Sequence, residues 1–194
     1  MKIILASKSP RRIEILKKIG LKFTVRNHKH SEEHLNIKSP SAFVRICSKH
    51  KAESTVIRED ELVIGADTIV YMEGKIIGKP ISRESAKKML KLLSGKKHIV
   101  YTGLTLIYKE NEINGVQRTN VYFKKIEDRE IYSYLEKAKY MDKAGAYAVQ
   151  EEASLFIEKI SGDFFNIVGF PVLLFSDLFE KVSGEKLYNV IWNR

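Results

Sequence analysis

Residues 3–12 read IILASKSPRR, an apolar run followed by a short polar loop and the first residues of a helix. The apolar run predicts a buried strand over residues 2–7. Ser9 and Pro10 predict a helix over residues 10–19, because serine is favoured at the N-cap and proline in the first helical turn. A strand that leads through a tight loop into a helix is typical of α/β and α+β proteins, so this stretch sets the expected fold class.

Cations crowd the start of this helix, at Lys8, Arg11 and Arg12. The helix dipole gives that end a positive partial charge, and each cation there costs roughly 0.3–1 kcal/mol. Backbone N–H groups together with several cations are typical of a site for a multiply charged anion such as phosphate. The alternative is that the arginines point into solvent and bind nothing.

The composition is that of a globular protein with a basic surface. The chain has 194 residues, 44% of them hydrophobic, and a net charge of +10. The charge favours anionic partners such as nucleotides, and its lysines are scattered rather than gathered into a stripe for nucleic acid. The single cysteine, Cys47, and the short N-terminal apolar run favour a cytoplasmic protein with no signal peptide, no disulfide and no contact with a membrane.

Strand and helix patterns alternate along the rest of the chain. Alternating and apolar runs predict further strands at residues 22–26, 62–72, 75–77, 98–108, 115–124 and 154–160. Glu73-Gly74 predicts a turn that joins the strand at residues 62–72 to its partner at residues 75–77. Apolar stripes at helical spacing predict further helices over residues 40–55, from the Ser82 cap to Ser94, over residues 127–139 and from Pro171 onward. The expected fold is therefore α/β or α+β with a mixed sheet.

Asp67 breaks the apolar pattern of its strand, which reads LVIGADTIV. A buried carboxylate must be paired or metal-bound, because an isolated buried charge is very costly. Asp67 is therefore either a structural carboxylate that caps a neighbouring helix, or a general base or metal ligand in a cleft. Gly65 and Ala66 beside it leave room for something to approach the backbone closely.

Two lysines and two glutamates are further candidates. Lys51 lies with Val44 and Cys47 on the stripe of its helix that should face the core, so it either snorkels outward or reaches into a polar cleft. Lys79 is either a surface lysine or a functional cation, whose direction Pro80 would fix. Glu32 and Glu33 lie in a polar loop and either face solvent or complete a divalent-cation site with Asp67. The irregular spacing of the histidines in that loop makes zinc a weak alternative.

The segment at residues 142–150 reads DKAGAYAVQ, and its small residues permit close packing. Gln150 at its end could recognise a nucleotide base through paired hydrogen bonds. The segment at residues 162–171 is typical of an elbow between a strand and a helix. Kinase, Rossmann dehydrogenase, serine hydrolase and thiol redox functions are disfavoured, because the chain has no Walker loop, GxGxxG, GxSxG or CxxC motif.

Several of these segments form an ordered set from Leu5 to about Leu174. They are Leu5-Ala6-Ser7 with Ser9-Pro10-Arg11-Arg12, Gly65-Ala66-Asp67-Thr68, Gly78-Lys79-Pro80, Leu93-Ser94-Gly95 with His98 and Thr102-Gly103, Asp142–Tyr147 with Gln150, and Gly162-Asp163 with Gly169 and Pro171. Together they resemble the Maf family of nucleoside triphosphate pyrophosphatases. Any one block alone would be a weak signal.

The resemblance implies a fold and a reaction. Residues 1–194 would form a single α/β domain, with an elongated mixed β-sheet flanked by helices and two lobes around a deep cleft, as in inosine-triphosphatase-like proteins. The family hydrolyses nucleoside triphosphates to the monophosphate and pyrophosphate with Mg²⁺ or Mn²⁺. It is considered a house-cleaning activity, it is linked to septum formation, and its members are often homodimers.

The resemblance also implies residue roles. Asp67 would orient or deprotonate the attacking water, or bind the metal together with Glu32 or Glu33. The loop before these glutamates is one residue longer than the family pattern, so which of the two takes the acidic role stays open. The substrate-binding residues would be Ser7, Arg11, Arg12, Lys51 and Lys79.

Three positions separate the subfamilies. Arg11, Thr68 and Gln150 match the type that acts on dTTP and UTP, whereas the type that acts on 7-methyl-GTP tends to have Trp, Gln and Glu there. The substrates expected are therefore dTTP and UTP, with modified pyrimidine nucleotides as further candidates.

Two alternatives remain open. The chain could be a non-catalytic module that binds nucleotides or nucleic acid, or that regulates division through a partner. A nucleic-acid groove expects aromatic side chains among its cations and gains nothing from a carboxylate on its floor. The chain could also run the same chemistry on non-standard purine triphosphates.

Overall fold

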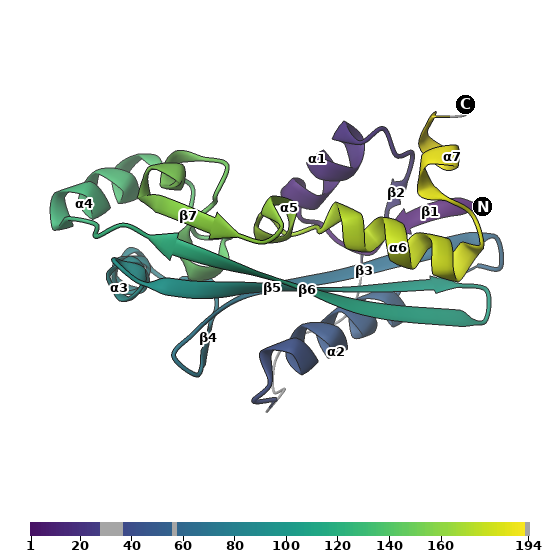
Figure 1. Cartoon of the computed structure of the whole chain (residues 1–194), viewed down its shortest axis with the longest axis horizontal. Helices are drawn as coiled ribbons and strands as arrows, with labels where there is room; N and C mark the ends of the chain where they lie inside the picture. Colours follow the sequence, from purple (N-terminus) through teal and green to yellow (C-terminus); the bar gives the residue numbers. More distant parts are fainter. Residues whose placement is uncertain (28–36, 56–57, 193–194) are drawn as a thin grey trace. The chain divides into compact units, whose positions relative to one another are not determined.

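The computed structural model describes residues 1–27, 37–55 and 58–192. In this part of the chain, a mixed sheet of seven strands has the order β2-β1-β3-β5-β6-β7, with β4 paired to β3 (Figure 1). The strands are β1 (Lys2–Leu5), β2 (Thr24–Val25), β3 (Glu61–Met72), β4 (Lys75–Ile77), β5 (Lys97–Tyr108), β6 (Asn111–Phe123) and β7 (Ile157–Ser161). The helices are α1 (Pro10–Lys18), α2 (Pro40–Glu53), α3 (Arg83–Leu93), α4 (Asp128–Lys137), α5 (Phe164–Val168), α6 (Val172–Ser183) and α7 (Leu187–Trp192). The predicted mixed sheet flanked by helices is confirmed.

The chain divides into two compact units. Unit 1 holds residues 1–67, 102–117 and 169–194, and unit 2 holds residues 68–101 and 118–168. The long strands β3, β5 and β6 contribute residues to both units. None of the helices in the described residues is long and apolar enough to cross a bilayer.

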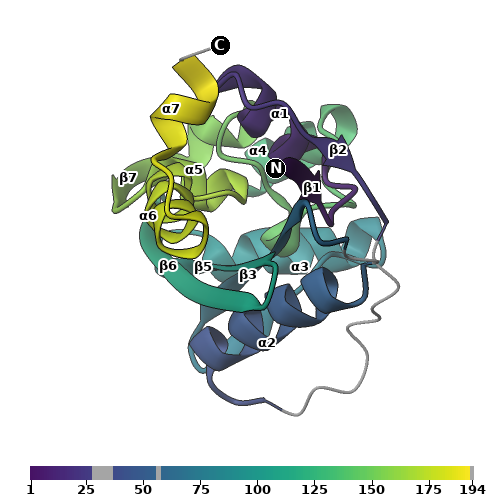
Figure 2. The ribbon, with the colours of Figure 1, turned by 90° about the vertical axis from the view of Figure 1, so that its right-hand side faces the viewer.

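In unit 1, helix α2 packs directly on the sheet at two glycines. A Cβ atom added to Gly65 of β3 would lie 2.1 Å from the carbonyl oxygen of Ser48, and one added to Gly103 of β5 would lie 2.3 Å from that of Val44. Helix α2 covers one face of these strands and α6 covers the other (Figure 2). The buried stripe predicted for α2, which includes Cys47, is confirmed.

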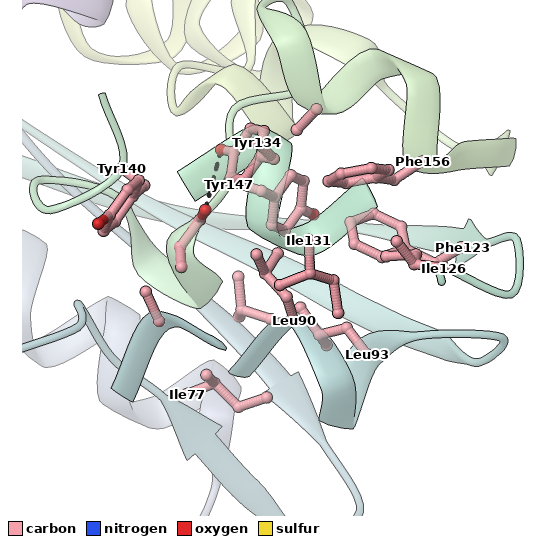
Figure 3. Packing of buried hydrophobic residues seen from close by; sticks show 14 of the residues in the cluster. Ile77, Leu90, Leu93, Phe123, Ile126, Ile131, Tyr134, Tyr140, Tyr147 and Phe156 are labelled. Atoms are coloured by element: carbon pink, nitrogen blue, oxygen red, sulfur yellow. Dashed lines mark hydrogen bonds between the residues drawn. The ribbon is translucent and has the colours of Figure 1, made fainter. Parts of the chain in front are cut away.

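In unit 2, helices α3 and α4 enclose an apolar core. Figure 3 shows Leu90 and Leu93 of α3 packed near Ile131 of α4, with aromatic rings from β6 and the segments after α4 beside them. The predicted turn between β3 and β4 is confirmed: Glu73 and Gly74 adopt φ angles of 49° and 79°. Positive φ at both positions matches the twist of a two-residue hairpin.

Some boundaries differ from the sequence predictions. The strand expected at residues 154–160 is β7 at Ile157–Ser161, and a 3₁₀ helix at Glu152–Phe156 precedes it. The helix expected to start at Pro171 starts at Val172, with Pro171 as its N-cap. The elbow at residues 162–171 contains the short helix α5.

Candidate active site

The loop between β1 and α1 is organised around the hydroxyl of Ser7. Ser7 Oγ accepts hydrogen bonds from Ser9 N at 3.3 Å and from Arg12 Nη1 at 3.0 Å. Arg12 Nε donates to Gly169 O at 2.9 Å, and the Arg12 side chain is buried. Because both lone pairs of the Ser7 oxygen accept N–H donors, its own proton remains available for an acceptor such as a phosphate oxygen.

The N-cap position predicted for Ser9 is confirmed, although its side chain makes no capping hydrogen bond within the described residues. The Ser7 hydroxyl accepts the Ser9 N–H, which folds the loop back on the end of β1. The alternative that both arginines point into solvent is wrong for Arg12, which is buried, while Arg11 is half-buried.

Lys51 and Asp67 form a buried ion pair. Lys51 Nζ lies 2.5 Å from Asp67 Oδ1, and each side chain is only 6% exposed. Lys51 therefore neither snorkels nor stays unpaired, and the carboxylate has the partner that its apolar strand required. Asp67 does not cap a helix through Oδ2: this second carboxylate oxygen is buried and has no hydrogen-bond partner in the described part of the chain.

The close approach at Gly65 explains how the pair forms. Gly65 and Asp67 lie two residues apart on β3, so they face the same side of the strand. The backbone of α2 sits on Gly65 at Ser48 and Ala52, the residues on either side of Lys51 along the helix surface. The space beside Gly65, where a close backbone approach was expected, is thus filled by α2, which brings the Lys51 ammonium to Asp67.

Ser7 and Asp67 project from neighbouring parallel strands of unit 1. Leu5 of β1 pairs with Ile64 of β3, and Ala6 N continues the ladder to Ile64 O at 2.9 Å. Ser7 follows β1 directly, and Asp67 lies three residues beyond Ile64 along β3. Ser7 therefore lies just after the carboxyl end of β1, and Asp67 lies on β3 just beyond the part that pairs with β1. Ligands of α/β proteins commonly bind where parallel pairing ends in this way.

The other predicted residues are distributed as follows. Thr68, Lys79 and Gln150 belong to unit 2, so the predicted set is divided between the units. Lys79 is exposed, Thr68 is half-buried, and Gln150 is exposed with its Nε2 3.4 Å from Glu151 Oε1. Glu32 and Glu33 lie outside the described residues, as does the histidine-containing part of their loop. Within the described ranges no cluster of three or more His, Cys, Asp or Glu residues could hold a metal ion.

Sequence reasoning missed the role of Lys143 inside the segment at residues 142–150. Its side chain is 5% exposed and forms ion pairs with Asp142 and Glu151. The sequence signal that could have indicated its burial is a lysine among small and apolar residues, just as Lys51 lies on an apolar helical stripe.

The family follows from comparison with known proteins. A family model described as "Maf-like protein" matches residues 2–182. The chain belongs to the Maf family. The resemblance seen in the sequence blocks is thereby confirmed.

Among curated Maf relatives, a Thermotoga maritima protein named "dTTP/UTP pyrophosphatase" is 46% identical, covering 93% of this chain and 90% of its own length. A protein of that name from Thermoanaerobacter sp. is 45% identical, covering 96% of this chain and 100% of its own length. Another protein of that name, from Thermosipho melanesiensis, is 41% identical, covering 100% of this chain and 98% of its own length. The solved structure of a HAM1 protein from Coxiella burnetii shares the fold, with a TM-score of 0.52 at 13% sequence identity. The match covers 93% of this chain and 99% of that chain.

Proposed function

We propose that this chain is a nucleoside triphosphate pyrophosphatase that hydrolyses dTTP and UTP to the monophosphate and pyrophosphate. The observation that carries the proposal is the buried Asp67 carboxylate, whose Oδ2 has no partner among the described residues although Oδ1 is held by Lys51. A buried unpaired oxygen of this kind is destabilising, and its retention is explained if a ligand or water completes it. The curated relatives, 41–46% identical over nearly their full length, carry this activity in their names.

The triphosphate would bind at the start of α1. The Ser7 hydroxyl, the Arg11 and Arg12 guanidinium groups and the exposed Lys79 ammonium would neutralise its charge, and backbone N–H groups at the helix N-terminus add to this. Positioning and charge stabilisation of this kind supply most of the catalysis in transfers at phosphorus.

Asp67 would act on the water that attacks the α-phosphorus. Its Oδ2 would accept a hydrogen bond from that water and take its proton as the new O–P bond forms, while Lys51 fixes the orientation of the carboxylate through Oδ1. The bond between the α-phosphorus and the bridging oxygen breaks, and pyrophosphate leaves. A water held in this way needs no covalent intermediate on the protein.

A divalent metal fits the chemistry of Asp67 in part. A carboxylate oxygen without a protein partner is the hard donor that Mg²⁺ prefers, and Mg²⁺ is commonly bound through one or two carboxylates plus substrate phosphates. Asp67, with Glu32 or Glu33, would hold Mg²⁺ or Mn²⁺, and the ion would polarise the phosphate oxygens and lower the pKa of a bound water.

Arg11, Thr68 and Gln150 would select the base. All three agree with the pattern of the dTTP and UTP type. The exposed Gln150 amide offers a donor and an acceptor, which suits the imide edge of thymine or uracil. A site built on such hydrogen bonds rejects other bases, because a mismatched base leaves polar groups unpaired. The homodimer, the cytoplasmic location and a role in septum formation or house-cleaning stay predictions.

The test is pyrophosphate release from dTTP, UTP, CTP, GTP, ITP and 7-methyl-GTP, with and without Mg²⁺ or Mn²⁺. We expect metal-dependent turnover concentrated on dTTP and UTP. Turnover concentrated on a purine triphosphate would keep the chemistry and refute the assignment of Arg11, Thr68 and Gln150. Absence of turnover from folded protein would favour a binding module, as would a salt-sensitive shift of DNA without pyrophosphate release.

A further inference from the structure

Lys143 is a buried lysine whose ammonium group is fully engaged. Its Nζ donates hydrogen bonds to the carbonyl oxygen of Lys139 and to Asp142 Oδ1 at 3.1 Å, and it forms an ion pair with Glu151 Oε2 at 3.3 Å. These oxygen atoms surround the ammonium group, and the Lys143 side chain is only 5% exposed. Lys143 therefore acts through the groups that it holds.

Lys143 is connected through Glu151 to Gln150, the residue proposed to recognise the base. Glu151 Oε2 forms an ion pair with Lys143, and Glu151 Oε1 lies 3.4 Å from Nε2 of the neighbouring Gln150. The Glu151 side chain is 38% exposed, so without Lys143 it would be free to adopt other rotamers. Lys143 therefore sets the position of the residue that flanks Gln150.

The same segment also contacts the loop that carries Lys79. Gly145 N donates a hydrogen bond to Gly78 O at 2.9 Å. Gly145 lies two residues after Lys143 in the sequence, and Gly78 lies directly before Lys79. Gly145 has a φ of 70°, and a Cβ there would lie 3.3 Å from both Val70 and Tyr147. The segment therefore cannot shift at Gly145 without disturbing the Lys79 loop.

Two tyrosines anchor the middle of the segment. Tyr134 of α4 donates its hydroxyl proton to Ala146 O at 3.0 Å (Figure 3). The Tyr147 hydroxyl lies 2.7 Å from Nε2 of the buried His98. Backbone hydrogen bonds from Glu151 N to Ala148 O and from Ser154 N to Glu151 O hold the main chain at the far end of the segment. Loss of the Lys143 charge would therefore release the Glu151 side chain beside Gln150, while the core of unit 2 keeps its tyrosine contacts.

We propose that Lys143 is a positioning residue for nucleotide recognition, which holds Gln150 through Glu151 and keeps the segment in register with the Lys79 loop. This inference rests on the proposed function, because it assumes that Gln150 reads the base and that Lys79 binds phosphate. It assigns Lys143 no contact with the substrate.

The test compares the wild type with Lys143→Met, Lys143→Arg and Glu151→Ala, using kcat and KM for dTTP, UTP and GTP. For Lys143→Met we expect the KM for dTTP to rise about tenfold, the preference for dTTP over GTP to fall about tenfold, and kcat to change less than about threefold. Glu151→Ala should change KM and preference in the same direction. Lys143→Arg, which keeps the charge, should recover most of the preference.

Lys124→Met is the matched control. Lys124 forms an ion pair with Glu130 at 2.6 Å in the same unit, outside the segment at residues 142–151. Its loss should leave the preference for dTTP over GTP unchanged. A general loss of stability would lower the melting temperature and the active fraction in any of these variants, but it would not change KM or base preference.

Three results would overturn the inference. The first is a Lys143→Met protein with a lower melting temperature but wild-type KM and base preference, which would make Lys143 purely structural. If Lys143→Met does not fold, wild-type KM and preference in Glu151→Ala, whose changed side chain is partly exposed, refute the inference equally. The third is a folded wild type that hydrolyses no nucleotide: it refutes the proposed function first and this inference with it.

Discussion

Gly65→Ala should push helix α2 away from β3 at this point and thereby lower the catalytic rate that depends on Asp67. The added Cβ would lie 2.1 Å from Ser48 O, 2.8 Å from Ala52 N and 2.9 Å from Ala52 Cβ. Two of these are backbone atoms, so no side-chain rotation can relieve them. Since Cβ contacts below 3.0 Å are essentially never found, α2 must retreat locally by about 0.9 Å.

The retreat has two measurable consequences. Overpacking of this kind costs about 1–3 kcal/mol, which lowers the melting temperature of a protein of this size by about 2–12 °C. It also moves Lys51, which lies between Ser48 and Ala52 on the helix, away from Asp67, whose Oδ1 it now contacts at 2.5 Å. Misplacing a catalytic group by about 1 Å can cost about a hundredfold in rate, so we expect a comparable fall in kcat for dTTP.

The assay pairs thermal unfolding with pyrophosphate release, and Gly103→Ala is its control. A Cβ at Gly103 would lie 2.3 Å from Val44 O, seven residues before Lys51 on the same helix. It should cost similar stability with a smaller loss of kcat. Gly65→Ala protein that melts within about 1 °C of the wild type and keeps its kcat would refute the packing of α2 and the link from Gly65 to Asp67.

Three further predictions address the chemistry and the core. Asp67→Asn should lower kcat by about 10²- to 10⁴-fold in folded protein, with a lower melting temperature because Lys51 loses its charged partner; near wild-type kcat would exclude Asp67 as base or metal ligand. Arg11→Ala should raise KM for dTTP or relax base preference, and unchanged values of both would contradict its assignment. Burial lowers the pKa of His98 from 6.5 to about 4, so between these pH values the unfolded chain binds more protons than the folded protein. The free energy of unfolding should therefore fall by up to about 3 kcal/mol as the pH falls from 6.5 to 4. Urea unfolding at both pH values, with His98→Gln as control, measures this loss; an equal loss in the variant would assign it to other groups.

The sequence predicted the elements whose patterns are local. Helix α2 shows this clearly: its apolar stripe ran through Val44 and Cys47 to Lys51, and all three residues are buried. The turn at Glu73-Gly74 was likewise predicted, because glycine in a two-residue turn tolerates the positive φ that the hairpin requires. Periodicity and turn chemistry depend on neighbouring residues only, so a single sequence is enough for them.

Other features depended on contacts between distant residues. Ser9 is the N-cap residue as predicted, but the sequence did not indicate that the Ser7 hydroxyl would accept hydrogen bonds from both Ser9 N and Arg12 Nη1. Arg12 is itself held by Gly169, which lies 157 residues away in sequence. The Lys51 partner could not be read from a helical stripe either, because it depends on how closely α2 approaches β3 at Gly65.

Two lysines are buried in the described ranges, Lys51 and Lys143, and their similar burial supports different roles. A buried ion pair adds little stability over apolar residues of the same volume, so its presence indicates another use. Lys143 is held by two hydrogen bonds and by an ion pair with Glu151, all within its own segment of the chain. Asp67, the partner of Lys51, keeps a buried oxygen that nothing in the described chain satisfies. The contacts of Lys143 suit a positioning role, whereas the incomplete pair at Asp67 suits chemistry, so we place the reacting water at Asp67 and give Lys143 an indirect role.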